Sequence, residues 1–130
     1  MALVDTSVWI RWFRTGSSSD LEPSQLRDAV ICSPILQELM QGFDDLPSHG
    51  RLCTQLLSIP RLTDPIPVNV YLSAADIART ARRKGYTIRS SVDCLIAAIA
   101  ILNDVPVLHF DRDFDIIARF TPLRVLRAKL

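Results

Sequence analysis

The sequence predicts an α/β fold, a three-layer α/β/α sandwich with a mainly parallel central sheet. Short apolar runs at residues 2–4, 29–32 and 105–110 are typical of buried strands, and stretches with helical periodicity separate them. Strands that alternate with helices indicate parallel pairing, with helices on both faces of the sheet. Because 48% of the 130 residues are hydrophobic, the chain can build one such two-sided core, and we expect a single domain over residues 1–130.

The first half of the chain is expected to alternate strand and helix. The expected elements are a strand at 2–4, a helix from 6 to the turn at 16–19, a weak polar helix at 20–28, a strand at 29–32, a helix from about 34 to 40 or 43 and a helix at 46–59. The first strand ends at Asp5, which the parallel arrangement places at the C-terminal edge of the sheet. Ser33 followed by Pro34 is a helix start signal, with serine at the N-cap.

The second half is expected to carry two long helices, one strand, a short helix and an edge strand. The expected elements are an extended piece framed by Pro60, Pro65 and Pro67, a helix at 67–84, a helix at 92–102, a strand at 105–110, a helix through 118 and an edge strand at 123–126. Gly85 is expected to stop the first long helix. Ser90 or Ser91 is expected to cap the second, and Asn103-Asp104 to end it.

Cysteine usage and hydropathy indicate the compartment. Cys32, Cys53 and Cys94 are far apart with no paired spacing, so we expect no structural zinc site, and free thiols fit a reducing compartment. The apolar run at residues 95–102 is shorter than the ~20 residues that a bilayer requires, and the N-terminus lacks a basic region followed by an apolar one. We therefore expect a cytoplasmic protein without membrane contact.

Acidic residues stand where strands end and helices begin. Asp5 and Asp111 follow strands, Asp93 falls in the first turn of an apolar helix, and Glu38 lies one turn into its helix. Since strand ends and helix starts in a parallel sheet face one edge, we expect these four carboxylates to converge. Each also has an ordinary explanation: Asp5 and Asp111 as helix caps, Asp93 as a charge that favours a helix N-terminus, and Glu38 as a solvated residue.

Four carboxylates at one edge require a cation. Like charges at close range repel each other, and burial adds the cost of desolvation. All-oxygen ligation favours Mg²⁺ or Mn²⁺ over zinc, and a hydroxyl from Thr6 or Ser7 can hold a bound water. Two such ions about 3.5–4 Å apart would form a phosphodiesterase site.

The net charge of +1 conceals an uneven distribution. Assigning four acids to one pocket leaves 15 basic residues against 10 acidic ones on the rest of the molecule. All the basic residues are arginine except Lys84 and Lys129, and a guanidinium suits bidentate contact with phosphate. Genomic composition bias is the alternative explanation of this arginine content.

Four blocks of sequence carry a specific pattern. They are residues 3–10 (LVDTSVWI), 36–39 (LQEL), 92–98 (VDCLIAA) and 110–114 (FDRDF). In order and spacing they resemble PIN-domain ribonucleases, specifically the VapC toxins of bacterial and archaeal toxin–antitoxin pairs. The resemblance spans nearly the whole chain; the first and third blocks are specific, the last is moderately so, and the Glu38 block is weaker.

This resemblance implies a PIN-like sandwich, a metal-dependent endoribonuclease, usually a homodimer, and inhibition by a small cognate antitoxin of the VapB type. By matching position, Asp5, Glu38 and Asp93 would form the acidic triad, with Asp111 as the fourth acid and Asp113 as the alternative. A water activated by Mg²⁺ or Mn²⁺ would attack an RNA phosphodiester bond. The arginines that are candidates for phosphate contact are Arg79, Arg82, Arg83, Arg89 and Arg112.

Two features of the pattern stay open at this point. His109 stands where many relatives carry threonine, and a packed strand histidine is favoured over a catalytic one. Trp9 is expected in the core, whereas Trp12 or Phe13 either completes that core or lines a groove for an amphipathic antitoxin helix.

Three other functions compete with the ribonuclease. A small Mg²⁺-dependent phosphatase of the haloacid dehalogenase type needs a later lysine and further acids, yet only 17 residues follow Asp113. A signalling receiver domain also needs a late lysine, and Lys129 is too close to the end of the chain. A catalytically inactive PIN-like module that binds RNA or protein is the third alternative, and retention of every matched acid argues against it.

Overall fold

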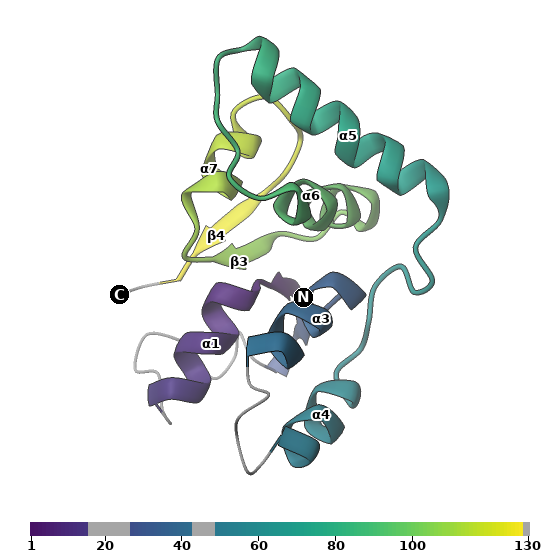
Figure 1. The fold of residues 1–130 in the computed structure, drawn as a ribbon, viewed down its shortest axis with the longest axis vertical. Helices are drawn as coiled ribbons and strands as arrows, with labels where there is room; N and C mark the ends of the chain where they lie inside the picture. The colour runs from purple at the N-terminus through teal and green to yellow at the C-terminus, as the bar shows by residue number, and fades with distance from the viewer. Residues whose placement is uncertain (16–26, 43–48, 129–130) are drawn as a thin grey trace.

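A parallel sheet lies between two layers of helices (Figure 1). The computed structural model describes residues 1–15, 27–42 and 49–128. The strands are β1 (Ala2–Val4), β2 (Ala29–Val30), β3 (Val107–His109) and β4 (Val125–Arg127), in the order β2-β1-β3-β4. All three neighbouring pairs are parallel, which confirms the expected α/β class.

Six helices are described on the two faces of this sheet. They are α1 (Thr6–Thr15), α3 (Ser33–Gly42), α4 (His49–Leu57), α5 (Val68–Arg83), α6 (Ser91–Asn103) and α7 (Arg112–Ala118). In Figure 1, α1, α3 and α4 lie below the sheet, and α5, α6 and α7 lie above it. The long helix α5 packs on α6. This is the three-layer arrangement that the alternation of elements predicts.

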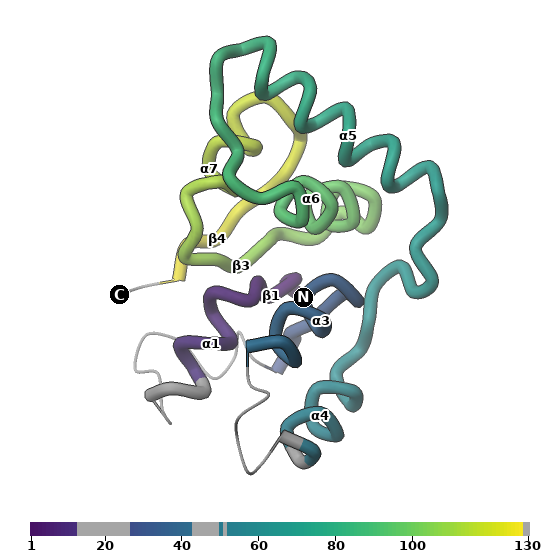
Figure 2. Tube along the Cα trace, in the orientation of Figure 1, coloured from purple at the N-terminus to yellow at the C-terminus, as the bar shows by residue number. Residues whose placement is uncertain are grey.

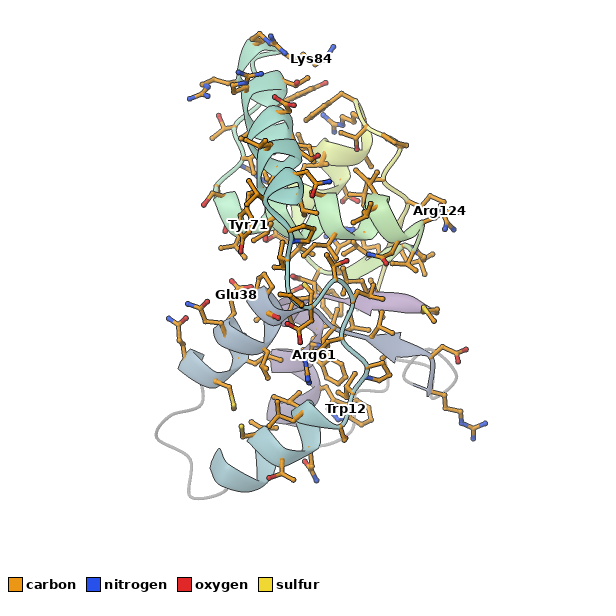
Figure 3. The ribbon with its side chains drawn as sticks, turned by 90° about the vertical axis from the view of Figure 1, so that its right-hand side faces the viewer. Trp12, Glu38, Arg61, Tyr71, Lys84 and Arg124 are labelled. Atoms are coloured by element: carbon orange, nitrogen blue, oxygen red, sulfur yellow. The ribbon has the colours of Figure 1, made fainter. Side chains whose placement is uncertain are left out.

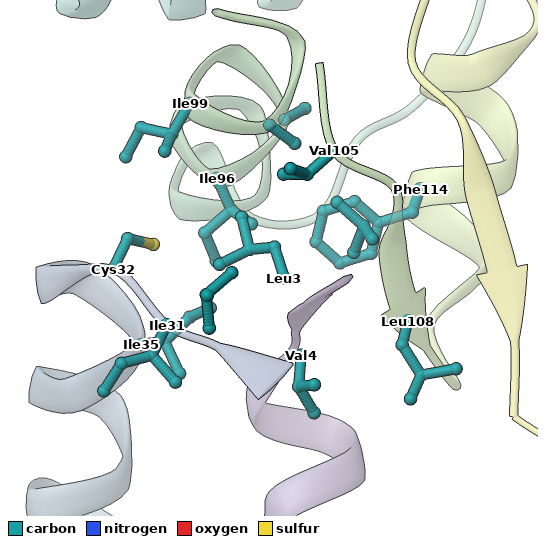
Figure 4. Close-up of a cluster of buried hydrophobic side chains, with 14 of the residues drawn as sticks. Leu3, Val4, Ile31, Cys32, Ile35, Ile96, Ile99, Val105, Leu108 and Phe114 are labelled. Atoms are coloured by element: carbon teal, nitrogen blue, oxygen red, sulfur yellow. The ribbon is translucent and has the colours of Figure 1, made fainter. Parts of the chain in front are cut away.

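The core is centred on β1, which lies beside β3 in the middle of the sheet (Figure 2). Leu3 and Val4 are fully buried, and Leu3 is in register with Val107. Ile96 from α6 and Phe114 from α7 close over the same cluster (Figure 4). Because helices cover both faces of β1, its residues read as a continuous apolar run rather than an alternating one.

Three strands differ from their expected limits. β2 covers 29–30 instead of 29–32. β3 begins at Val107 rather than at residue 105, because the Val105 amide donates to the Ala100 carbonyl at the end of α6 and Pro106 has no amide hydrogen. β4 covers 125–127 instead of 123–126, with Leu123 buried ahead of it. Part of the expected polar helix at 20–28 and the turn at 16–19 fall outside the described residues.

The expected ends of α5 and α6 are confirmed, whereas α4 ends at Leu57 rather than at residue 59. Two expected serine caps are not made. Gly85 follows α5 with φ +80°, and Asp104 ends α6 in the left-handed conformation with φ 52°. Ser90 stands at the N-cap of α6 without a side-chain capping bond. Ser33 is the first residue of α3, and its hydroxyl donates to Asp64 Oδ1 (3.3 Å).

Two of the cysteines belong to the apolar core. Cys32 and Cys94 are buried free thiols, and desolvation raises their pKa values to about 12 and about 11. They therefore act as small apolar side chains. Among the described helices, none has the length and apolar character needed to cross a bilayer.

Candidate active site

The end of β1 and the start of α1 position the first two acids. Asp5 is 4% exposed, and its Oδ2 accepts from the Ser7 amide (3.1 Å) and the Ser7 hydroxyl (2.6 Å). The neighbouring Thr6 hydroxyl donates to Glu38 Oε1 (2.9 Å), which ties the first turn of α1 to α3. Glu38 is half-buried on α3 (Figure 3). Asp5 thus caps its helix, as the ordinary explanation predicts, within reach of a second carboxylate.

A second group of acids gathers at the starts of α6 and α7. Carboxylate oxygens of Asp93, Asp111 and Asp113 all lie within 4.8 Å of one another. Asp111 is the N-cap of α7, and its Oδ1 accepts from the Asp113 amide (2.9 Å). Asp93 and Asp113 are 5% and 1% exposed, whereas the Asp111 side chain is more accessible to solvent. Asp111 and Asp113, the two candidates for the fourth acid, therefore both lie beside Asp93.

Burial and mutual repulsion make these acids hard to ionise together. Desolvation, followed by the charges of Asp5, Asp111 and Asp113, raises the pKa of Asp93 from 3.8 to about 9. Desolvation also raises the pKa of Asp5, against the lowering effect of its Ser7 hydrogen bonds, and the Glu38 charge raises it further. The charges of the two groups of acids therefore influence one another, and Asp93 interacts with both groups.

The donor set fits a hard divalent cation. Within the described parts of the chain, Asp93 Oδ2 and Asp113 Oδ1 are buried side-chain oxygens with no hydrogen-bond partner. Such orphaned acceptors cost free energy unless a proton or a cation satisfies them. Carboxylate oxygens within 4.8 Å of one another are the ligands that Mg²⁺ and Mn²⁺ prefer. Asp93, Asp111 and Asp113 are accordingly able to hold a metal ion, with Asp5 beside them.

A hydroxyl links the two strand ends that carry acids. Ser7 Oγ donates to Asp5 and also accepts from the Phe110 amide (3.1 Å), directly after β3. Asp5 donates its own amide to the Leu108 carbonyl of β3 (2.9 Å). The carboxylate of Asp5 and the segment leading to Asp111 are therefore held in a fixed relation. The sequence suggested Thr6 or Ser7 as a hydroxyl that holds a bound water, and it gave no sign of the Ser7 contact with Phe110.

Of the five candidate arginines, Arg89 contacts the acids in the described part of the chain. Its amide donates to Asp113 Oδ2 (2.9 Å), and its guanidinium lies 3.7 Å from Asp111 Oδ1 and 3.9 Å from Asp113 Oδ1. The Arg89 side chain is 62% exposed and therefore faces solvent beside Asp111. Arg89 therefore offsets negative charge there and remains accessible to a phosphate.

The other candidate arginines lie elsewhere or carry no contact with the acids. Arg79 pairs with Asp76 (2.6 Å), and Arg83 donates to the Thr80 hydroxyl. Arg82 and Arg83 are in the last turn of α5, whose end at Lys84 lies well away from Glu38 in Figure 3. Exposed Arg112 directly follows Asp111 at the start of α7.

The aromatic residues of α1 divide between the core and its margin. Trp9 is 6% exposed, and its indole donates to the Val4 carbonyl (3.0 Å), so its expected place in the core is confirmed. Trp12 is half-buried and packs against the same core. The side chain of Phe13 lies outside the described residues.

Comparison of the sequence with known proteins identifies the family of this chain. The PIN domain model matches residues 2–120. Ribonuclease VapC11 of Mycobacterium tuberculosis and VapC ribonuclease Mb1587 of Mycobacterium bovis are each 40% identical over 130 residues, covering 95% of this chain and 96% of theirs.

Solved structures share the fold at lower identity. VapBC-1 from nontypeable Haemophilus influenzae has a TM-score of 0.73 at 19% identity and covers 97% of this chain and 96% of its own. VapBC2 from Rickettsia felis, bound to a DNA fragment from its promoter, also has a TM-score of 0.73, at 17% identity and 98% coverage of both chains. The acids at one edge of the parallel sheet agree with the family model and the sequence relatives. The chain belongs to the PIN-domain family, among the VapC ribonucleases.

Proposed function

We propose that the chain is the toxin of a toxin–antitoxin pair, and that residues 1–130 form one PIN domain which cuts RNA with Mg²⁺ or Mn²⁺. The cluster of the buried Asp93 and Asp113 with the more accessible Asp111, in which two oxygens have no partner among the described residues, supports this proposal. When bound, the ion would supply an activated water and neutralise charge on the phosphate. The other acids at this edge of the sheet would assist the bound ion.

The residues of the chain take distinct roles in this proposal. Asp93, Asp111 and Asp113 would hold the ion, and Asp5, whose charge acts on Asp93, would be a further oxygen donor. Glu38, held by Thr6, orients the attacking water or adds a ligand. Arg89 contacts the phosphate from the open side of the cluster, and Arg112 is a second candidate there.

The test compares two acid-to-amide substitutions of equal chemistry. Asp93→Asn is expected to lower cleavage of total RNA by at least 100-fold in Mg²⁺ or Mn²⁺, because a buried ligand oxygen is lost. Asp76→Asn changes an exposed acid on α5 and should leave cleavage unchanged. Equal cleavage by wild type and Asp93→Asn would defeat the assignment.

We further propose that the toxin forms a homodimer through the exposed apolar side of α5. Val68, Tyr71 and Leu72 are 50–73% exposed there, and their spacing places these apolar side chains on one side of the helix. Leu72→Asp should shift a dimer to monomer in sedimentation, whereas Leu57→Asp on α4, at a leucine that is also exposed, should not. Dimerisation that Leu72→Asp does not affect would place the interface elsewhere.

A cognate VapB-type antitoxin in the cytoplasm is the proposed regulator. Both structural relatives named above are VapBC complexes, in which the toxin is accompanied by its antitoxin. A basic side chain brought towards the acids would offset their repulsion, as Arg89 does in part, and would compete with the metal ion. Excess Mn²⁺ should therefore weaken antitoxin binding, and binding that does not depend on Mn²⁺ would exclude this mode of inhibition.

A further inference from the structure

The segment between β3 and α7 is held by side chains on both sides. Phe110 and Asp111 are the two residues that separate the end of β3 from the start of α7. The Phe110 amide donates to the Ser7 hydroxyl (3.1 Å), and the Asp111 amide donates to His109 Nδ1 (3.0 Å). Two successive backbone donors thus have side-chain acceptors instead of backbone ones. The direction in which Asp111 leaves the strand depends on both acceptors.

The His109 ring is fixed in one orientation by its surroundings. It is fully buried at the end of β3 and lies against the Phe114 ring, with centroids 5.4 Å apart. Because Nδ1 accepts a hydrogen bond, it carries no proton, and the neutral ring has its proton on Nε2. Nε2 lies 3.2 Å from Asp115 Oδ1, an off-axis contact that is electrostatic rather than a well-aligned hydrogen bond.

Asp115 is in turn held from the edge of the sheet. Its Oδ2 pairs with Arg127 Nη1 (2.8 Å), and Arg127 is in register with His109 across β3 and β4. The Ala128 amide also donates to the His109 carbonyl (3.0 Å). A chain of contacts therefore runs from β4 through Asp115 and the imidazole to the amide of Asp111. No atom of His109 needs to touch metal or RNA for this chain to matter.

We propose that His109 is a positioning residue, which sets the place of the Asp111 carboxylate by accepting the Asp111 backbone hydrogen bond. The Asp111 carboxylate must accept from the Asp113 amide through Oδ1 (2.9 Å) and also keep one oxygen within 4.8 Å of Asp93 and Asp113 oxygens. A shift of the Asp111 amide moves this carboxylate out of the shared corner. Residues that orient a ligand typically change metal affinity or activity by about 10–100-fold when replaced.

Two substitutions that introduce an amide side chain distinguish the roles of the two ring nitrogens of His109. In His109→Asn the amide oxygen falls near the position of Nδ1 and can still accept from Asp111. In His109→Gln the amide reaches towards Asp115, and the Asp111 amide loses its acceptor. We expect Mn²⁺ affinity, measured by calorimetry, to fall by about 10–100-fold in His109→Gln and by only a few-fold in His109→Asn. In cleavage assays at fixed Mg²⁺, kcat should fall in His109→Gln with KM for RNA unchanged.

Because this role rests on the proposed function, the two must fail in different ways. Wild type that binds no Mn²⁺ would overturn the proposed function. Wild type that binds Mn²⁺, with His109→Gln binding as tightly or His109→Asn equally impaired, would overturn only the positioning role. If either variant fails to fold, nitrogen NMR of wild type decides: a proton on Nε2 and none on Nδ1 supports the role, and the opposite tautomer overturns it.

Discussion

Asp93→Asn is expected to stabilise the metal-free protein near neutral pH. The Asp93 carboxyl is 5% exposed, and desolvation is the main cause that raises its pKa from 3.8 to about 9. Between these pH values the folded chain keeps a proton that the unfolded chain has released, so the free energy of unfolding falls as pH rises. Asparagine resembles the protonated carboxyl in shape and has no such proton to lose. The substitution therefore removes a pH-dependent destabilisation.

The size of the effect follows from that pH interval. One proton held only by the folded chain changes the free energy of unfolding by about 1.4 kcal/mol per pH unit, which sets an upper limit of about 4 kcal/mol at pH 7. Asp5, Asp111 and Asp113 repel Asp93 and share its titration, so the measured effect is smaller. We expect a gain of about 1–3 kcal/mol at pH 7 and a difference in slope of about 1 kcal/mol per pH unit.

Urea unfolding in excess chelator between pH 5 and 8 measures both quantities. Wild type should lose stability relative to Asp93→Asn as the pH rises. Asp76→Asn is the matched control, because the Asp76 side chain is 65% exposed and its substitution should change stability by less than about 0.5 kcal/mol. Parallel pH profiles for wild type and Asp93→Asn would refute the reasoning, since they would mean that Asp93 ionises normally in the fold.

Three further outcomes are expected. Ser7→Ala should lower the free energy of unfolding by about 1–3 kcal/mol, because the Phe110 amide loses its acceptor and Asp5 a donor; unchanged urea unfolding would contradict this. On an Asp5→Asn background, Arg89→Gln should weaken RNA binding and reduce the salt slope by about 0.7, unlike Arg79→Gln. Trp12→Ala should weaken the antitoxin complex in calorimetry, and undiminished binding would remove the proposed groove.

The elements near the site follow from local sequence signals. Asp5 could be placed because an apolar run opens into an acid and a helix, and parallel strands end at one edge. Asp93 and Asp111 follow from the same rule, applied to the start of α6 and the end of β3. The limits of β2, β3 and β4 were wrong by up to two residues, since strand length depends on which backbone groups find partners across the sheet.

The contacts that tune the site depend on tertiary structure. No spacing in the sequence indicates that Ser7 accepts from Phe110, 103 residues away. Arg89 was one of five arginine candidates, and its approach to Asp111 and Asp113 depends on how the segment before α6 folds back on α7. The role of Asp115 beside His109 has no sequence signal either, because an acid in the first turn of a helix is ordinary.

RNA cleavage by chelator-treated protein, before and after Mn²⁺ is restored, tests whether the acidic site acts through a bound metal ion. If the edge formed by Asp5, Asp93 and Asp111 acts through a bound ion, cleavage should stop in excess chelator and return with Mn²⁺ or Mg²⁺. Asp93→Asn should show no return at the same ion concentration, while Asp76→Asn should match wild type. Cleavage that persists in excess chelator, or that Asp93→Asn regains in full, would contradict the account.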